Sequence, residues 1–150
     1  MTLPFTGRCA CGGVQYRATA RPTFSWLCHC RDCQRASGSA YCAIAYLPRD
    51  ALAVQGDVRY HTVLAESGNR VSRGFCADCG SPMFILADLV PDLQGVWAAS
   101  LEEPAAFPPV VQVWCDSAQA WDTLHPTLPR IAKAPSPAEF ERILADAAGR

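Results

Sequence analysis

The chain has 150 residues, half of them apolar, and its 13 basic and 14 acidic side chains give a formal net charge of −1. This length and composition predict one globular domain over residues 1–150 and exclude extensive disorder. The basic residues are dispersed, so the sequence lacks the positive stripe that binds phosphate backbones, and we expect no nucleic-acid partner. No apolar run approaches the ~18 residues of a membrane span, so we expect no membrane partner.

The first predicted strand covers residues 14–18, where apolar and polar side chains alternate with the two-residue period of a half-buried strand. Pro22 interrupts the pattern, which resumes over residues 24–28. Residues 34–39 are polar and contain a glycine, so they predict a loop.

The middle of the chain predicts a β-meander with turns at glycine- and serine-rich positions. Further strands are expected at residues 40–47, 51–55, 57–64, 70–75, 83–86, 96–99 and 110–114. The first of these is almost entirely apolar and should be buried on both faces.

A short helix is expected at the C-terminus. Ser136, Pro137 and Glu139 have the spacing of an N-cap, a first helical residue and a capping box. Its apolar stripe consists of Phe140, Ile143 and Leu144. The predicted fold class is therefore mainly β, with antiparallel sheets and a short C-terminal helix.

Nine cysteines are many for this length, and an odd number argues against a disulfide framework. Residues 1–5 lack the basic and apolar regions of a secretory signal. We expect a cytoplasmic protein, because a reducing compartment keeps thiolates free to bind metal.

Seven of the cysteines form three short motifs. They are the pair Cys9 and Cys11, the triplet Cys28, Cys30 and Cys33, and the pair Cys76 and Cys79. The two pairs together supply the four thiolates of a closed, structural zinc site. The triplet leaves one position of a tetrahedral ion open, which is typical of catalytic zinc. Loss of either pair should impair folding, because structural zinc contributes folding free energy.

The residues alone leave other interpretations open. One flanking pair could consist of buried core thiols. Cys30 and Cys33 could form a reversible redox pair. A fourth protein ligand could also close the triplet, and the candidates are His29, His61, His125, Cys42 and Cys115. Strand alternation disfavours His29, whose side chain should project away from its cysteine neighbours, and lone cysteines in apolar segments are usually small buried hydrophobes.

The order of the motifs resembles the glutathione-dependent formaldehyde-activating enzyme (GFA) family. The resemblance is carried by RCACGGV at residues 8–14, CHCRDCQR at residues 28–35 and GFCADCGSP at residues 74–82. PVVQVW at residues 109–114, followed by Trp121, is similar to the family as well. The resemblance covers residues 7–130. It implies a zinc-pinned β-tent of antiparallel sheets, with a second zinc held by the triplet beside a substrate cleft.

The resemblance also implies a carbon–sulfur lyase of the S-(hydroxymethyl)glutathione synthase type, whose partners are a small thiol such as glutathione and an aldehyde. We expect two zinc ions per chain, with partial occupancy allowed at the triplet. Zinc there could deprotonate the glutathione thiol or polarise the aldehyde oxygen, and three anionic ligands favour the first role. Candidates for binding the glutathione carboxylates are Arg31, Arg35, Arg70 and Arg73.

Two alternative functions remain open. The protein could be a lyase for a different thiol–carbonyl adduct, or a non-catalytic zinc-binding interaction module of the β-tent type. The intact triplet favours an enzyme, because a structural module needs only the four flanking cysteines.

Overall fold

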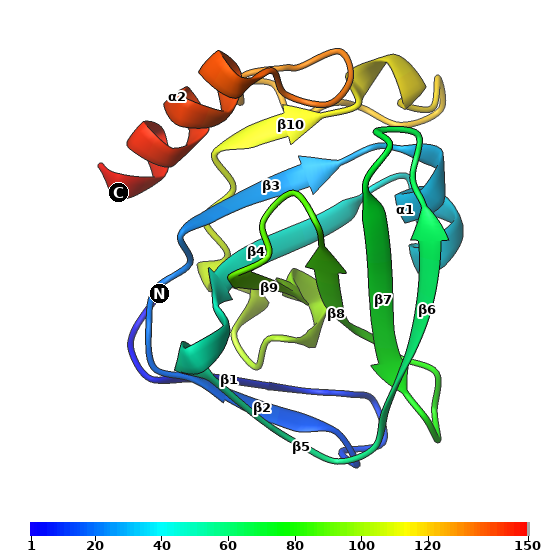
Figure 1. Cartoon of the computed structure of the whole chain (residues 1–150), viewed down its shortest axis with the longest axis vertical. Helices are drawn as coiled ribbons and strands as arrows, with labels where there is room; N and C mark the ends of the chain where they lie inside the picture. The colour runs from blue at the N-terminus through cyan, green and yellow to red at the C-terminus, as the bar shows by residue number, and fades with distance from the viewer. Residues whose placement is uncertain (150) are drawn as a thin grey trace.

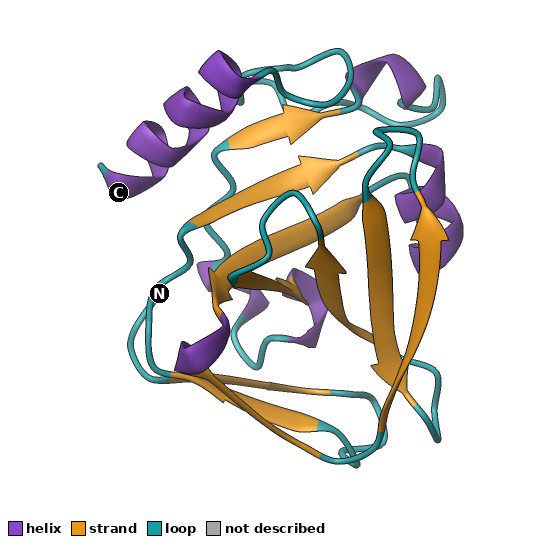
Figure 2. Cartoon of the chain, viewed as in Figure 1, coloured by secondary structure: helices purple, strands orange, loops and turns teal. Residues whose placement is uncertain are grey.

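The computed structural model describes residues 1–149 and consists mainly of β-strands in two sheets (Figures 1 and 2). The smaller sheet has the order β1 (Phe5–Arg8), β2 (Gln15–Ala18) and β5 (Leu52–Gln55). The larger sheet has the order β10 (Val111–Val113), β3 (Phe24–Cys28), β4 (Cys42–Pro48), β9 (Leu93–Trp97), β8 (Pro82–Ala87), β7 (Arg70–Cys76) and β6 (Val58–Leu64). Short 3₁₀ turns occur at Arg49–Ala51, Ala98–Ser100, Pro104–Ala106 and Cys115–Ser117.

The predicted fold class is confirmed, with one exception in strand direction. Every strand pair is antiparallel except β10 and β3, in which Val111 lies opposite Trp26 and Val113 lies opposite Cys28 in parallel register. The connection from β9 carries two 3₁₀ turns and a proline-rich loop, long enough to bring β10 back in the direction of β3.

One element contradicts the sequence prediction. Residues 34–39, expected as a loop, lie largely within helix α1 (Arg31–Ser37). Cys30 is the N-cap, and its Sγ accepts a hydrogen bond from Cys33 N at 3.3 Å. The glycine expected as a hinge ends the helix, because Gly38 adopts the left-handed conformation with φ 65°.

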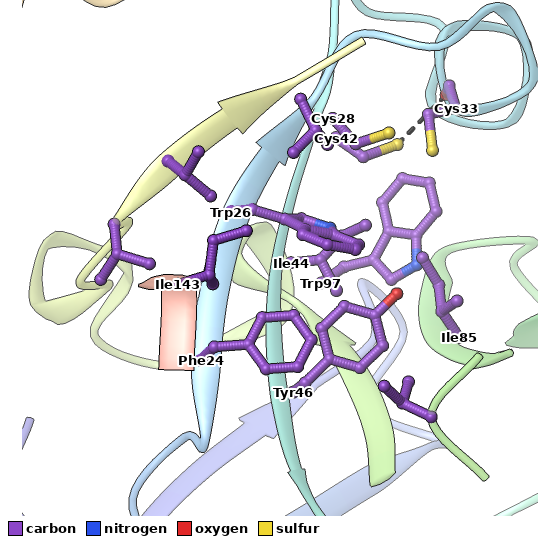
Figure 3. Packing of buried hydrophobic residues seen from close by; sticks show 14 residues of the cluster. Phe24, Trp26, Cys28, Cys33, Cys42, Ile44, Tyr46, Ile85, Trp97 and Ile143 are labelled. Carbon is purple, nitrogen blue, oxygen red and sulfur yellow. Dashed lines mark hydrogen bonds between the residues drawn. The ribbon is translucent and has the colours of Figure 1, made fainter. Parts of the chain in front are cut away.

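The larger sheet is covered on both faces. Between the two sheets lies a cluster that includes Val14, Tyr16, Ala45, Leu47, Met83, Phe84 and Val96. The opposite face carries a second cluster that includes Phe24, Trp26, Ile44, Tyr46, Ile85 and Trp97 (Figure 3). Successive β4 side chains therefore enter different clusters, and this strand is buried on both faces as predicted.

The C-terminal helix α2 (Pro137–Ala148) is confirmed with its predicted cap. Ser136 Oγ accepts from Glu139 N at 3.4 Å, and a Glu139 carboxylate oxygen accepts from Ser136 N at 2.8 Å. The Phe140 ring packs edge-on against Phe24, with centroids 5.2 Å apart. The helix thus lies beside β3 on the second face (Figure 1). Of the helices in residues 1–149, none has the length and apolar character needed to cross a membrane.

Candidate metal centres

Four cysteines from the two flanking motifs form one cluster. Every pair among the Sγ atoms of Cys9, Cys11, Cys76 and Cys79 lies within 4.8 Å. The first two residues follow β1, whereas Cys76 ends β7 and Cys79 lies in the turn before β8. The cluster therefore joins the β1–β2 hairpin of the smaller sheet to the β7–β8 hairpin of the larger one.

Hydrogen-bond donors from the adjoining turns reach these sulfur atoms. Gly13 N donates to Cys11 Sγ at 3.4 Å, and the Ser81 hydroxyl lies 3.2 Å from Cys79 Sγ. The Ser81 hydroxyl, followed by the Ser81 backbone N–H, lowers the pKa of Cys79 to about 5. Gly12, with φ 78°, lets the chain turn sharply behind its cysteine pair. Such donors stabilise thiolates and favour metal binding.

Cys28, Cys30 and Cys33 form a second cluster, whose Sγ atoms also lie within 4.8 Å of one another. Cys28 is the last residue of β3, Cys30 caps α1, and Cys33 lies in the first turn of that helix. The sulfur atoms meet because the strand passes into the helix within two residues.

The three thiols of this cluster bind protons unequally. Hydrogen bonds with Cys28 and Cys30 hold the pKa of Cys33 well below its usual value, whereas hydrogen bonds with Cys30 and Cys33 raise the pKa of Cys28. The Arg73 guanidinium also favours the Cys33 thiolate, with Nη2 lying 3.9 Å from Cys33 Sγ. Thiolate sulfur is a soft ligand, so this group of cysteines suits a soft cation.

All three cysteines line a cavity of about 480 Å³ on the second face of the larger sheet. Its apolar lining includes Trp26, Ile44, Tyr46, Val71, Ile85 and Trp114. Figure 3 shows Cys28 and Cys33 at the end of the row formed by Trp26, Ile44 and Tyr46. Helix α1 and the β6–β7 turn contribute most of the charged lining.

The other suggested ligands do not join the triplet. Within residues 1–149, no further His, Cys, Asp or Glu ligand atom lies within 4.8 Å of all three sulfurs. His29 is buried and lines a separate cavity. Cys42 Sγ donates to the Cys33 carbonyl at 3.1 Å, and Cys115 Sγ donates to the Gln112 carbonyl at 3.6 Å. All nine cysteines are free thiols.

The two remaining histidines also lie elsewhere. His61 is exposed on β6, and His125 Nδ1 accepts from Thr127 N at 3.4 Å.

Three of the four arginines suggested for carboxylate binding line the cavity, namely Arg31, Arg35 and Arg73. Arg35 lies at the rim with an exposed side chain, 3.8 Å from Asp32. Arg70 is exposed on β7 and is not among the lining residues.

Three of the apolar residues that line the cavity, Trp26, Tyr46 and Ile85, were not predicted from the sequence as part of a site. Trp26 could have been found from the sequence, because it lies two residues before Cys28 in the same strand and therefore projects to the same face of β3. Tyr46 and Ile85 carry no comparable signal, because they reach the cavity through strand pairing.

The chain is similar to known proteins over most of its length. The sequence profile of the family described as "Glutathione-dependent formaldehyde-activating enzyme" matches residues 4–117, which include all three cysteine motifs. A protein of Halomonas elongata, provisionally named as such an enzyme, is 27% identical over 108 residues, 69% of each chain. A Rhodobacter sphaeroides protein of known crystal structure has the same fold, with a TM-score of 0.50 and 22% identity over 65% of this chain and 87% of that one. The chain therefore belongs to the glutathione-dependent formaldehyde-activating enzyme family.

Proposed function

We propose that this protein is a zinc-dependent carbon–sulfur lyase that condenses glutathione, or a related thiol, with formaldehyde to the S-hydroxymethyl adduct and catalyses the reverse reaction. The observation that carries the proposal is the opening of the three-cysteine cluster into a cavity of about 480 Å³. Cys28, Cys30 and Cys33 supply three ligands of a tetrahedral ion and leave the fourth position for a substrate. Family membership supports the same reaction class.

The donor atoms of both clusters suit zinc. Four sulfurs around a tetrahedral zinc lie roughly 3.8 Å apart, given Zn–S distances of about 2.3 Å. Cys11 Sγ lies 3.4 Å from Cys9 Sγ and 3.7 Å from Cys76 Sγ, which is close to that spacing. We assign a structural ion to the four-cysteine cluster and a catalytic ion to the triplet. Both require reduced thiols, so we place the protein in the cytoplasm.

The ion at the triplet would supply thiol activation, because coordination deprotonates a thiol. The reaction needs no oxidant or reductant. The S–H bond breaks, a C–S bond forms at the carbonyl carbon, and the carbonyl oxygen takes the proton as a hydroxyl group. Arg73 lies beside Cys33 and would favour negative charge on an incoming sulfur atom. Arg31 and Arg35 at the rim would bind the glutathione carboxylates through forked hydrogen bonds.

The test is NMR exchange spectroscopy on glutathione, formaldehyde and their adduct. We expect the zinc-loaded protein to accelerate exchange and Cys30→Ser to abolish the acceleration. Cys115→Ser is the matched control, because this cysteine lies outside both clusters. Absence of acceleration with two zinc ions bound would contradict the proposal. It would instead favour a lyase for another adduct or a non-catalytic zinc-binding module.

A further inference from the structure

The cavity beside the three-cysteine cluster is larger and more apolar than formaldehyde requires. Its volume of about 480 Å³ lies in the range of sites that enclose drug-sized ligands. Formaldehyde adds a single carbon to the thiol sulfur, and glutathione is polar on both sides of its thiol. The apolar wall of the cavity is formed by Trp26, Ile44, Tyr46, Ile85, Ala87 and Val90.

Strand register places these apolar side chains on one face of the larger sheet, which Arg73 shares because it lies opposite Ile85. Trp26 lies opposite Ile44 across β3 and β4, and Val71 lies opposite Ala87 across β7 and β8. Paired residues project to the same face of a sheet. Cys28 follows Trp26 on that face of β3, so the apolar wall begins directly beside the cysteine cluster.

Gly95 in β9 keeps the side chains of the wall close to the sheet. A Cβ atom at Gly95 would lie 2.9 Å from Ile44 Cγ2 and 3.2 Å from both Ile85 Cβ and Tyr46 Cε1. These three side chains line the cavity and pack over the bare backbone of Gly95. A methyl group there would push them into the cavity, so the glycine preserves the space in front of them.

Trp114 lines the same cavity in an unusual backbone conformation. Its φ of 61° is the only positive value at a non-glycine residue in the part of the chain described. Bulky residues rarely adopt this conformation, which persists only where the surroundings impose it. Hydrogen bonds from Trp114 N to the Lys133 carbonyl at 3.1 Å and from Ser117 N to the Trp114 carbonyl at 3.0 Å hold it in place. A residue in a strained backbone conformation therefore lines the cavity.

Most of the charged lining residues lie on α1 and in the β6–β7 turn, whereas Arg73 lies against Cys33 of the cluster. Asp32 and Arg35 lie on α1, and Glu66 lies in the β6–β7 turn. The cavity is thereby divided into a charged rim, suited to the polar ends of a thiol such as glutathione, and an apolar wall beside the sulfur cluster.

We infer that the apolar wall is a subsite for an apolar substituent, about the size of a phenyl ring, on the carbonyl carbon. The favoured substrates are then adducts of glutathione-like thiols with aryl or alkyl aldehydes. This inference rests on the proposed lyase function. The reaction balances as for formaldehyde: the S–H bond breaks, a C–S bond forms, and the carbonyl oxygen takes the proton, while the substituent replaces one of the two hydrogens on the carbonyl carbon.

Stable thioethers test the subsite without catalysis. S-benzylglutathione carries a phenyl ring where the substituent of the aldehyde would lie, and S-methylglutathione lacks it. Isothermal titration calorimetry on the zinc-loaded protein should give binding of the benzyl compound roughly tenfold tighter than that of the methyl compound. Ala87→Leu places a larger side chain in the space that the phenyl ring would occupy, so this variant should remove the preference. Val71→Phe is a second filling variant, and Ala53→Leu on exposed β5 is the control that should retain the preference.

The outcomes separate this inference from the proposed function. Equal affinity for the two thioethers, or a preference unchanged in both filling variants, would overturn the apolar subsite even if glutathione–formaldehyde exchange is accelerated. If the benzyl compound binds more tightly and both filling variants abolish this preference, the apolar subsite is supported. That result would stand even if the protein does not accelerate glutathione–formaldehyde exchange and the lyase proposal fails.

Discussion

The guanidinium of Arg73 lies against the three-cysteine cluster, with Nη2 3.9 Å from Cys33 Sγ. Arg73 Nε is buried without a hydrogen-bond partner, and across residues 1–149 no carboxylate forms an ion pair with this arginine. Burial of a cation without a counter-charge is unfavourable. Three thiolates around a divalent ion carry a net charge of −1, which Arg73 would neutralise.

We therefore predict that Arg73→Gln weakens zinc binding at the triplet. The loss of one partly buried electrostatic contact corresponds to about 1 kcal/mol, or roughly a fivefold lower affinity. Competition with a chelator of known affinity measures this change. Arg70→Gln, on the exposed side of the same strand, should leave the affinity unchanged. Equal zinc affinity in Arg73→Gln and the unmodified protein would show that Arg73 does not act on the cluster.

The two clusters should respond differently to the loss of a ligand. Cys79→Ser removes a ligand from the cluster that joins the two sheets, so we expect loss of folded structure. Cys30→Ser removes a ligand at the cavity and should leave a folded protein with one zinc ion. Circular dichroism and metal analysis measure both properties. Equal damage in the two variants would contradict the division into structural and catalytic sites.

Local patterns in the sequence predict much of this fold. The alternation of apolar and polar side chains predicts most of the strands, and the spacing of Ser136 and Glu139 predicts the capped helix. Both features depend only on residues that are close together in the sequence. The three-cysteine cluster is equally local, whereas the four-cysteine cluster joins two motifs 65 residues apart and is predicted from the ligand count of a tetrahedral metal site.

Helix α1 could not be predicted in this way because its support comes from distant parts of the chain. Gln34 Nε2 donates to the His29 carbonyl at 2.6 Å and to the Ser117 carbonyl at 2.9 Å, and Ser117 is 83 residues away in sequence. The cavity has the same origin. It combines β3, β4, β7 and β8 through a strand order that no local pattern specifies.

Helix α2 should contribute substantially to stability through Ile143. This side chain is 4% exposed and belongs to the cluster on the second face of the larger sheet. Ile143→Ala should lower the free energy of unfolding by about 2–4 kcal/mol, because it removes buried methyl groups and leaves a cavity. Urea denaturation measures the change. Glu141→Ala, on the exposed side of the helix, is the control and should change stability by less than about 0.5 kcal/mol.

Alkaline pH should destabilise the protein through Tyr16, which lies between the two sheets with its hydroxyl 3.0 Å from Ser100 Oγ. Burial raises the pKa of Tyr16 from 10 to about 12. Because the folded pKa is raised, the neutral phenol's contribution to stability is fully present below about pH 10 and is lost as the pH rises towards 12. The free energy of unfolding, measured with urea at a series of pH values, should therefore fall over this interval. Burial also raises the pKa of Tyr46, so part of the decline should persist in Tyr16→Phe, with a smaller slope. An unchanged slope in that variant would contradict the assignment to Tyr16.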